Sequence, residues 1–123
     1  MNLSKSEARV LEVLWDEPPL TVGQVVERLQ QQTGWHANTI KTLLMRLVEK
    51  NAANRYKDGG RYFYGAILTR EAVLSEESDS LLNRFFDGRT APLVAHLADR
   101  KKLSDRDIRE IRKILKELKN RGT

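Results

Sequence analysis

The sequence has no cysteine among its 123 residues. Disulfide bonds, thiolate metal sites and a cysteine nucleophile are therefore excluded. Its two histidines stand sixty positions apart, so a zinc or copper site would need carboxylates or a second chain. No run approaches the roughly 18 to 20 apolar residues of a membrane span, and the N-terminus lacks the apolar segment of a signal peptide. We expect a cytoplasmic protein with no metal, no other cofactor and no membrane insertion.

Patterns typical of enzymes are also missing. We find no histidine–carboxylate cluster, no phosphate-binding loop and no carboxylate pair that stands out from helix surface charge. The sequence therefore predicts no catalytic residues and a protein that is not an enzyme. The length predicts one compact domain, or one with an appendage.

Positive charge is in surplus, with a formal net charge of +5 and a pI near 9.7, and its distribution is uneven. Residues 38–61 hold six Lys and Arg against two acids, and residues 100–121 hold ten against four. A basic surplus favours an anionic partner. We interpret the first cluster as a binding surface and most of the second as the solvated face of a helix with another role.

Residues 38–50 predict an amphipathic helix around which the chain is organised. Ile40, Leu43, Leu44 and Leu47 follow the i, i+3, i+4, i+7 spacing of one apolar stripe. The remaining faces carry Asn, Thr, Lys, Met and Arg side chains, which can reach base edges, phosphates or a thymine methyl group. An ordinary solvated helix face is the alternative, and the neighbouring elements favour DNA recognition.

Two helical patterns precede this helix. Ser4 and Glu7 have the spacing of a capping box that opens the first, and the two prolines in residues 16–19 end it. Thr21 is a plausible N-cap for a second helix that runs to about Gln32. The order therefore predicts a helix-turn-helix.

A short break separates the second helix from the third. Gly34 suits the left-handed position at a helix C-terminus, and either His36 or Asn38 caps the helix that follows. We interpret His36 as a passive cap, with a phosphate contact as the alternative. Residues 51–54 end the third helix.

Asp58-Gly-Gly-Arg61 predicts a two-residue hairpin turn, since its glycines tolerate the positive φ that such turns need. In this register Tyr56 faces Phe63 on one side, and Arg55 with Tyr64 and Lys57 with Tyr62 lie on the other. We expect one side to pack inward and the other to present cations backed by aromatic rings. This hairpin is interpreted as a DNA-contacting wing.

The predicted fold is mainly α with a small β-hairpin. A winged helix-turn-helix head covers residues 1–69 and a helical dimerisation region covers residues 70–123. The predicted DNA-contacting residues are Asn38, Thr39, Lys41, Thr42, Met45, Arg46, Lys50, Arg55, Lys57, Arg61, Tyr62 and Tyr64.

The last third of the chain predicts helices over residues 70–86 and 93–100, and a final helix capped by Ser104 and Asp107. That helix has a coiled-coil-like apolar seam. Three short helices bury too little surface to fold alone, so a second copy is expected to cover them, with folding back on the head as the alternative. The predicted dimerisation residues are Leu81, Leu82, Phe85, Phe86, Leu93, Val94, Leu97, Ile108, Ile111, Leu115 and Leu118.

Five stretches together resemble the BlaI/MecI penicillinase-repressor family of bacterial winged-helix regulators. They are residues 6–15 (SEARVLEVLW), 35–47 (WHANTIKTLLMRL), 60–64 (GRYFY), 93–97 (LVAHL) and 103–111 (LSDRDIREI). The resemblance implies a homodimer that represses transcription by occupying a two-fold symmetric DNA operator. It also implies that the third helix enters the major groove and that the wing touches the flanking backbone.

In well-studied family members a membrane-bound sensor protease cuts the dimerisation arm between an Asn and a Phe. Alignment on Leu93-Val94 places that bond at His96–Leu97, so the residues at the bond differ here. Copper-responsive relatives carry a C-terminal cysteine motif, which this chain lacks. The predicted function is thus a dimeric transcriptional repressor, relieved by proteolysis or by another signal acting on the arm. The alternative is a winged-helix protein-interaction module.

Overall fold

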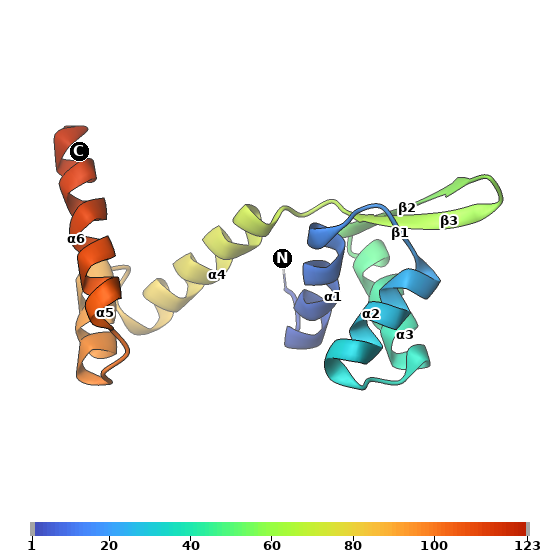
Figure 1. Ribbon diagram of the computed structural model, residues 1–123, viewed down its shortest axis with the longest axis horizontal. Coiled ribbons are helices and arrows are strands. Elements are labelled where there is room, and N and C mark those ends of the chain that lie inside the picture. Colours follow the sequence, from blue (N-terminus) through green and yellow to red (C-terminus); the bar gives the residue numbers. More distant parts are fainter. Residues whose placement is uncertain (1, 123) are drawn as a thin grey trace. The chain divides into compact units, whose positions relative to one another are not determined.

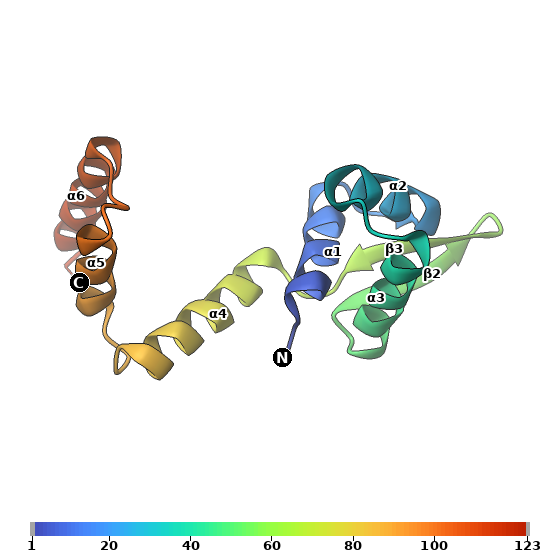
Figure 2. The ribbon, with the colours of Figure 1, turned by 90° about the horizontal axis from the view of Figure 1, so that it is seen from below.

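The computed structural model describes residues 2–122 and divides the chain into two compact units, residues 1–77 and 78–123. Figures 1 and 2 show the elements from two sides. In chain order they are α1 (Lys5–Asp16), β1 (Leu20–Thr21), α2 (Val22–Thr33), α3 (Ala37–Glu49), β2 (Ala53–Asp58), β3 (Arg61–Ala66), α4 (Arg70–Phe85), α5 (Thr90–Asp99) and α6 (Asp105–Asn120). The division falls inside α4, and each unit is described by itself.

Local side-chain caps explain where three of the helices begin. The hydroxyl of Ser4 accepts from the Glu7 amide while the Glu7 carboxylate accepts from the Ser4 amide, which confirms the predicted capping box. Thr21 forms the same reciprocal pair with Gln24 at the start of α2. Ser104 forms the third box at the start of α6. Each box satisfies amides that have no partner inside the helix.

The break between α2 and α3 also follows from its residues. Gly34 adopts φ +73°, the left-handed conformation expected of it, and its amide donates to the Gln30 carbonyl. Of the two candidate caps, the structure selects His36, whose Nδ1 accepts from the Asn38 amide at 3.5 Å. That distance is at the outer limit of a hydrogen bond, so this cap is weaker than the serine and threonine boxes.

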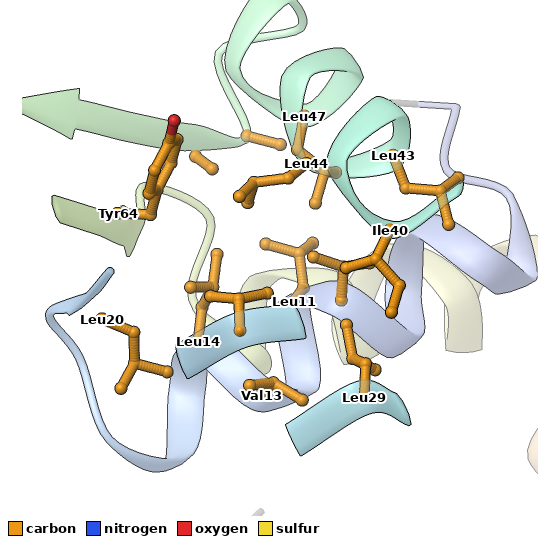
Figure 3. Packing of buried hydrophobic residues seen from close by; sticks show 14 residues of the cluster. Leu11, Val13, Leu14, Leu20, Leu29, Ile40, Leu43, Leu44, Leu47 and Tyr64 are labelled. Atoms are coloured by element: carbon orange, nitrogen blue, oxygen red, sulfur yellow. The ribbon is translucent and has the colours of Figure 1, made fainter. Parts of the chain in front are cut away.

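The core of the first unit lies between its three helices and the sheet (Figure 3). Apolar side chains of α1, α2 and α3 point toward one another, and Leu20 and Tyr64 close the side next to the strands. The buried hydrophobic residues are Val10, Leu11, Val13, Leu14, Leu20, Val25, Leu29, Ile40, Leu43, Leu44, Leu47, Ala52, Ala53 and Tyr64. All four residues of the predicted stripe on α3 are in this list, so their burial fixes which face of α3 remains outside.

The sheet is antiparallel with the order β1-β3-β2. The turn joins Asp58 to Arg61, and Gly59 and Gly60 adopt φ +59° and +80°, as a type I′ hairpin requires. The predicted cross-strand register is confirmed. The hairpin of β2 and β3 extends beyond the helices of its unit in both views (Figures 1 and 2).

Two features of this unit differ from the sequence prediction: the residue at which β2 begins and the presence of β1. Residues 53 and 54 were expected in the segment that ends α3, but β2 already begins at Ala53, which is buried and pairs with Ala66. The second difference is β1, where Leu20 pairs with Tyr64 and Thr21 with Phe63. A strand of two residues is too short to show an alternating pattern.

The helices that follow the hairpin differ from α1, α2 and α3 in their burial. Among the described residues of α4, α5 and α6, none is buried. The helix predicted to begin at Leu93 begins at Thr90, so Pro92 lies in its first turn. Proline is tolerated there because a first-turn amide has no helical partner to lose.

Candidate nucleic-acid interface

The outer face of α3 is polar and open to solvent. Burial of its apolar stripe leaves Asn38, Thr39, Lys41, Thr42 and Arg46 exposed, and Met45 half-buried at the edge. Shallow hollows between these side chains run along the helix. The structure therefore brings the predicted α3 residues together on one accessible face, with the exception of Lys50.

Hydrogen bonds determine what this face can offer. The Thr42 hydroxyl donates to the Asn38 carbonyl at 2.9 Å, so in this exposed side chain the hydroxyl oxygen can still accept a hydrogen bond. Asn38 presents an amide that can donate and accept, and Lys41 and Arg46 present donors with positive charge. Such a set matches the acceptors and methyl groups at the base edges of the major groove.

The wing presents cations held against an aromatic ring. The Arg55 guanidinium lies 4.7 Å from the centre of the Tyr62 ring, and the Lys57 ammonium lies 5.7 Å from it. These contacts orient two flexible side chains by cation–π attraction. Arg61 is exposed at the turn. The four residues form a positively charged end of the hairpin that can contact phosphates.

The expectation that one side of the hairpin packs inward and the other outward is wrong. Tyr64 lies on the same side as Tyr62, yet it is only 5% exposed and belongs to the core, whereas Tyr62 is 46% exposed. On the other side Tyr56 stacks on Phe63 at 5.8 Å and stays 46% exposed. Burial therefore changes along the length of the hairpin: side chains at its base are packed against the core, and those near its tip are exposed. Tyr64 therefore has a structural role and leaves the candidate interface.

Lys50 was also expected to contact DNA, and the structure gives it another partner. Its ammonium lies 2.8 Å from Oε1 of Glu7, a side chain only 4% exposed, and donates to the Asn2 carbonyl at 2.9 Å. Burial by itself raises the pKa of Glu7, but the hydrogen bonds from Lys50 and Ser4 outweigh it and hold that pKa below its ordinary value. Lys50 thus joins the end of α3 to α1, and we assign it this structural role; its contact with DNA stays a prediction.

One part of this surface was missed from the sequence. Thr21 and Val22, at the start of α2, line an apolar hollow of about 270 Å³ together with Arg61, Tyr62 and Tyr64. The pairing of β1 with β3 brings the start of α2 beside the wing. The sequence indicates only that Thr21 is an N-cap. It does not predict β1, because a strand of two residues is too short to show a pattern.

The predicted dimerisation residues all retain solvent exposure within their unit. Leu81, Phe85, Val94, Ile108, Leu115 and Leu118 are 36% to 65% exposed, and Leu82, Phe86, Leu93, Leu97 and Ile111 are half-buried. His96 is exposed on α5, with its ring 6.4 Å from that of Phe86. None of these apolar side chains is fully buried within a single copy of the protein over residues 2–122.

Residues 2–122 hold neither a candidate metal site nor a candidate membrane span. No group of three or more His, Asp or Glu side chains there could hold a metal ion. No helix in the same described range is long and apolar enough to cross a membrane.

The three-helix head with its hairpin and the exposed polar face of α3 define a winged helix-turn-helix protein. The family model for the penicillinase repressor matches residues 3–117, so the chain belongs to the penicillinase repressor family. It is 32% identical over 120 residues to the penicillinase repressor of Bacillus licheniformis, covering 98% of this chain and 94% of the relative. It is 27% identical to the methicillin resistance regulatory protein MecI of Staphylococcus aureus (strain N315), covering 93% of each.

Two solved structures of BlaI are similar to part of this chain. The DNA-binding domain of this repressor matches with a TM-score of 0.53 and 28% identity, over 58% of this chain and 87% of that one. The monomeric form of B. licheniformis BlaI, solved in complex with the blaP half-operator, matches with the same score and identity over 58% and 88%. The regulator MepR of S. aureus, at 18% identity and a TM-score of 0.53, shares the fold.

Proposed function

We propose that this protein is a DNA-binding transcriptional repressor that occupies a two-fold symmetric operator as a homodimer in the bacterial cytoplasm. The observation that carries the proposal is the exposed face of α3, where amide, hydroxyl and cationic groups lie together beside a cationic wing. The similarity of this unit to a family member solved with its half-operator supports the same use of the surface. The proposed activity is binding, without a catalytic step.

In the proposed complex α3 reads bases in the major groove. Asn38 is suited to adenine, and Lys41 and Arg46 to guanine or to a phosphate. Thr39 and Thr42 are suited to a phosphate or a thymine methyl group. Met45 can lie against a thymine methyl group. Arg55, Lys57, Arg61 and Tyr62 bind the flanking backbone and set the register of the head on the duplex.

Residues 70–123 are proposed to form the dimer. Their exposed apolar side chains, with no buried residue along α4, α5 or α6 in the described part of the chain, favour coverage by a second copy. Once one head is bound, the second meets its half-site at a high effective concentration, so dimerisation increases operator affinity without new contacts in the heads. Weakening of this region would release the DNA.

We propose that a signal acting on the dimerisation region relieves repression, and a cut by a membrane-bound sensor protease is one such signal. The aligned bond, His96–Leu97, lies inside α5, where the His96 carbonyl accepts from the Arg100 amide at 3.1 Å. Proteases that bind substrates as extended strands would need this turn to unwind. A cut at this bond therefore requires local opening of α5.

The test compares Arg46→Ala with Arg70→Ala on a duplex selected from a random pool by the purified protein. Arg70 is exposed at the start of α4, so its removal is the control for loss of one positive charge. Loss of a base contact costs about 1–3 kcal/mol, so Arg46→Ala should weaken binding roughly five- to 150-fold, with the control near wild type. Equal effects of the two variants would refute the assigned surface. Absence of any selected duplex would favour a protein-interaction module.

A further inference from the structure

The net positive charge of this protein lies outside the head that is proposed to read DNA. Residues 1–77 carry ten Lys and Arg and ten Asp and Glu, whereas residues 78–123 carry twelve and seven. The first unit is therefore neutral overall, and the second has the whole surplus of five charges. Because long-range attraction to a polyanion depends on such a surplus, the second unit must supply most of it.

Five cations of α6 form what we term the basic stripe: Arg109, Arg112, Lys113, Lys116 and Lys119. At about 100° per residue they fall within about 120° of one another around the helix, and they span about 15 Å along it. All five are exposed, and none of them forms an ion pair with another of the residues that the structure describes. Asp105 lies on the same side in the first turn. Beyond Lys113, Glu117 lies about 40° outside the stripe and Glu110 about 60° outside it, where Glu110 is paired with Arg106.

The apolar residues of α6 lie on a different side of the helix. Ile108, Ile111, Leu115 and Leu118 repeat at intervals of three and four, and this seam is the one proposed to contact the second copy. The centre of the basic stripe lies about 120° around the helix from the centre of the seam, and Arg112 and Lys119 border the seam. A dimer formed through the seam would therefore leave Arg109, Lys113 and Lys116 of each copy in solvent, with Arg112 and Lys119 at the edge of the interface.

We propose that the basic stripe is a second DNA-binding surface, which attracts duplex DNA through its phosphates without reading sequence. Duplex DNA carries one negative charge for every roughly 1.7 Å of its axis, so about nine phosphates lie along a length equal to that of the stripe. A row of five cations can therefore pair with about half of these phosphates. The inference goes beyond operator recognition by the heads, and relies on that proposed function only for the identity of the polyanion.

An anionic membrane surface is the other polyanion with this charge, and the composition of α6 argues against it. Helices that lie on membranes insert aromatic and large apolar side chains at the interface. α6 has no Phe, Trp or Tyr among its sixteen residues, and its apolar seam is proposed to be covered by a second copy. Attraction of DNA through its phosphates requires only the cations of the basic stripe.

The test uses the full chain, a random-sequence 40-base-pair duplex and a series of salt concentrations. In one variant all five residues of the basic stripe are replaced by Gln. In the control, Arg109→Lys and Arg112→Lys retain the charge. Each phosphate contact contributes about 0.9 to the slope of log affinity against log salt. We expect the Gln variant to lose about two or more units of slope and about tenfold of low-salt affinity, and the control to match wild type.

Three outcomes would overturn the inference. An unchanged salt slope in a Gln variant that remains a dimer by sedimentation would show a merely solvated surface. Dissociation of the Gln variant into monomers would assign the stripe to the protein interface. Loss of binding to vesicles of phosphatidylglycerol and phosphatidylcholine, with DNA binding intact, would assign it to a membrane. Operator recognition is tested separately by Arg46→Ala on the selected duplex, so failure of the two proposals is distinguishable.

Discussion

Replacement of Lys50 by Met should destabilise the head instead of removing a DNA contact. The Lys50 ammonium is 2.8 Å from the Glu7 carboxylate, and Glu7 is nearly fully buried. Without Lys50, Oε1 retains the Ser4 amide, while Oε2 has no hydrogen-bond partner in the described structure. The variant therefore leaves a buried carboxylate with one neutral donor.

The magnitude follows from these contacts. A hydrogen bond to a charged group contributes about 1.5–3 kcal/mol. Lys50 itself is 38% exposed, so solvent screens part of the attraction, and we expect a loss of about 2 kcal/mol. A unit of this size changes its melting temperature by about 4–8 °C per kcal/mol. The head should therefore melt about 10 °C lower at neutral pH.

Tryptophan fluorescence can follow this transition, because both tryptophans of the chain, Trp15 and Trp35, are in the first unit. The pKa of Glu7 is lowered in the folded state, so its contribution to stability is present above its ordinary pKa and is lost as pH falls through the lowered value. Removal of Lys50 raises that pKa. The difference in melting temperature between wild type and variant should thus be largest near neutral pH and should vanish as pH falls below the ordinary pKa of a glutamate and through the lowered value. An unchanged melting temperature with weaker DNA binding would refute the structural role of Lys50.

Three further predictions test other parts of the molecule. Leu115→Asp places a charge on the exposed apolar seam of α6 and should split the dimer in sedimentation experiments; a variant that remains dimeric would show that the seam is not the interface. Gly60→Ala forces a side chain into φ +80° at a cost of about 1–2 kcal/mol and should weaken DNA binding severalfold, whereas Gly23→Ala, inside α2, should leave it unchanged. Trp15→Phe removes the 2.8 Å hydrogen bond from the indole to the Leu68 carbonyl and should lower the free energy of unfolding in urea by about 1 kcal/mol; no change would show that water replaces this bond.

Local signals in the sequence predict most of the head. Ser4 with Glu7 has the spacing of a capping box, and this box forms; outside the head, Ser104 with Asp107 forms the box predicted for α6. The two glycines after Asp58 predict the turn and, through it, the register of the whole hairpin. The apolar stripe of α3 predicts which face is buried and so which face is available. These features depend on residues a few positions apart, and the predicted fold and family are confirmed.

The errors come from contacts between distant parts of the chain. The ion pair of Lys50 with Glu7 joins residues 43 positions apart, and no periodicity marks such a pair. Tyr64 alternates with Tyr62 on the strand, but the base of the hairpin is covered and its tip is free, which alternation alone does not reveal. The start of α5 was placed after Pro92, although the first turn of a helix accepts proline. The assignment of the DNA-contacting and dimerisation residues stays a prediction.

Selection of duplexes from a random pool, by the purified protein at near-physiological salt, tests the central proposal most directly. A dimer with two α3 helices should enrich two inverted half-sites whose centres are about one helical turn apart, or a multiple of it. Binding to the enriched duplex should survive salt that abolishes binding to the unselected pool. A pool that shows no enrichment, or a motif with a single half-site, would contradict a dimeric, sequence-specific repressor.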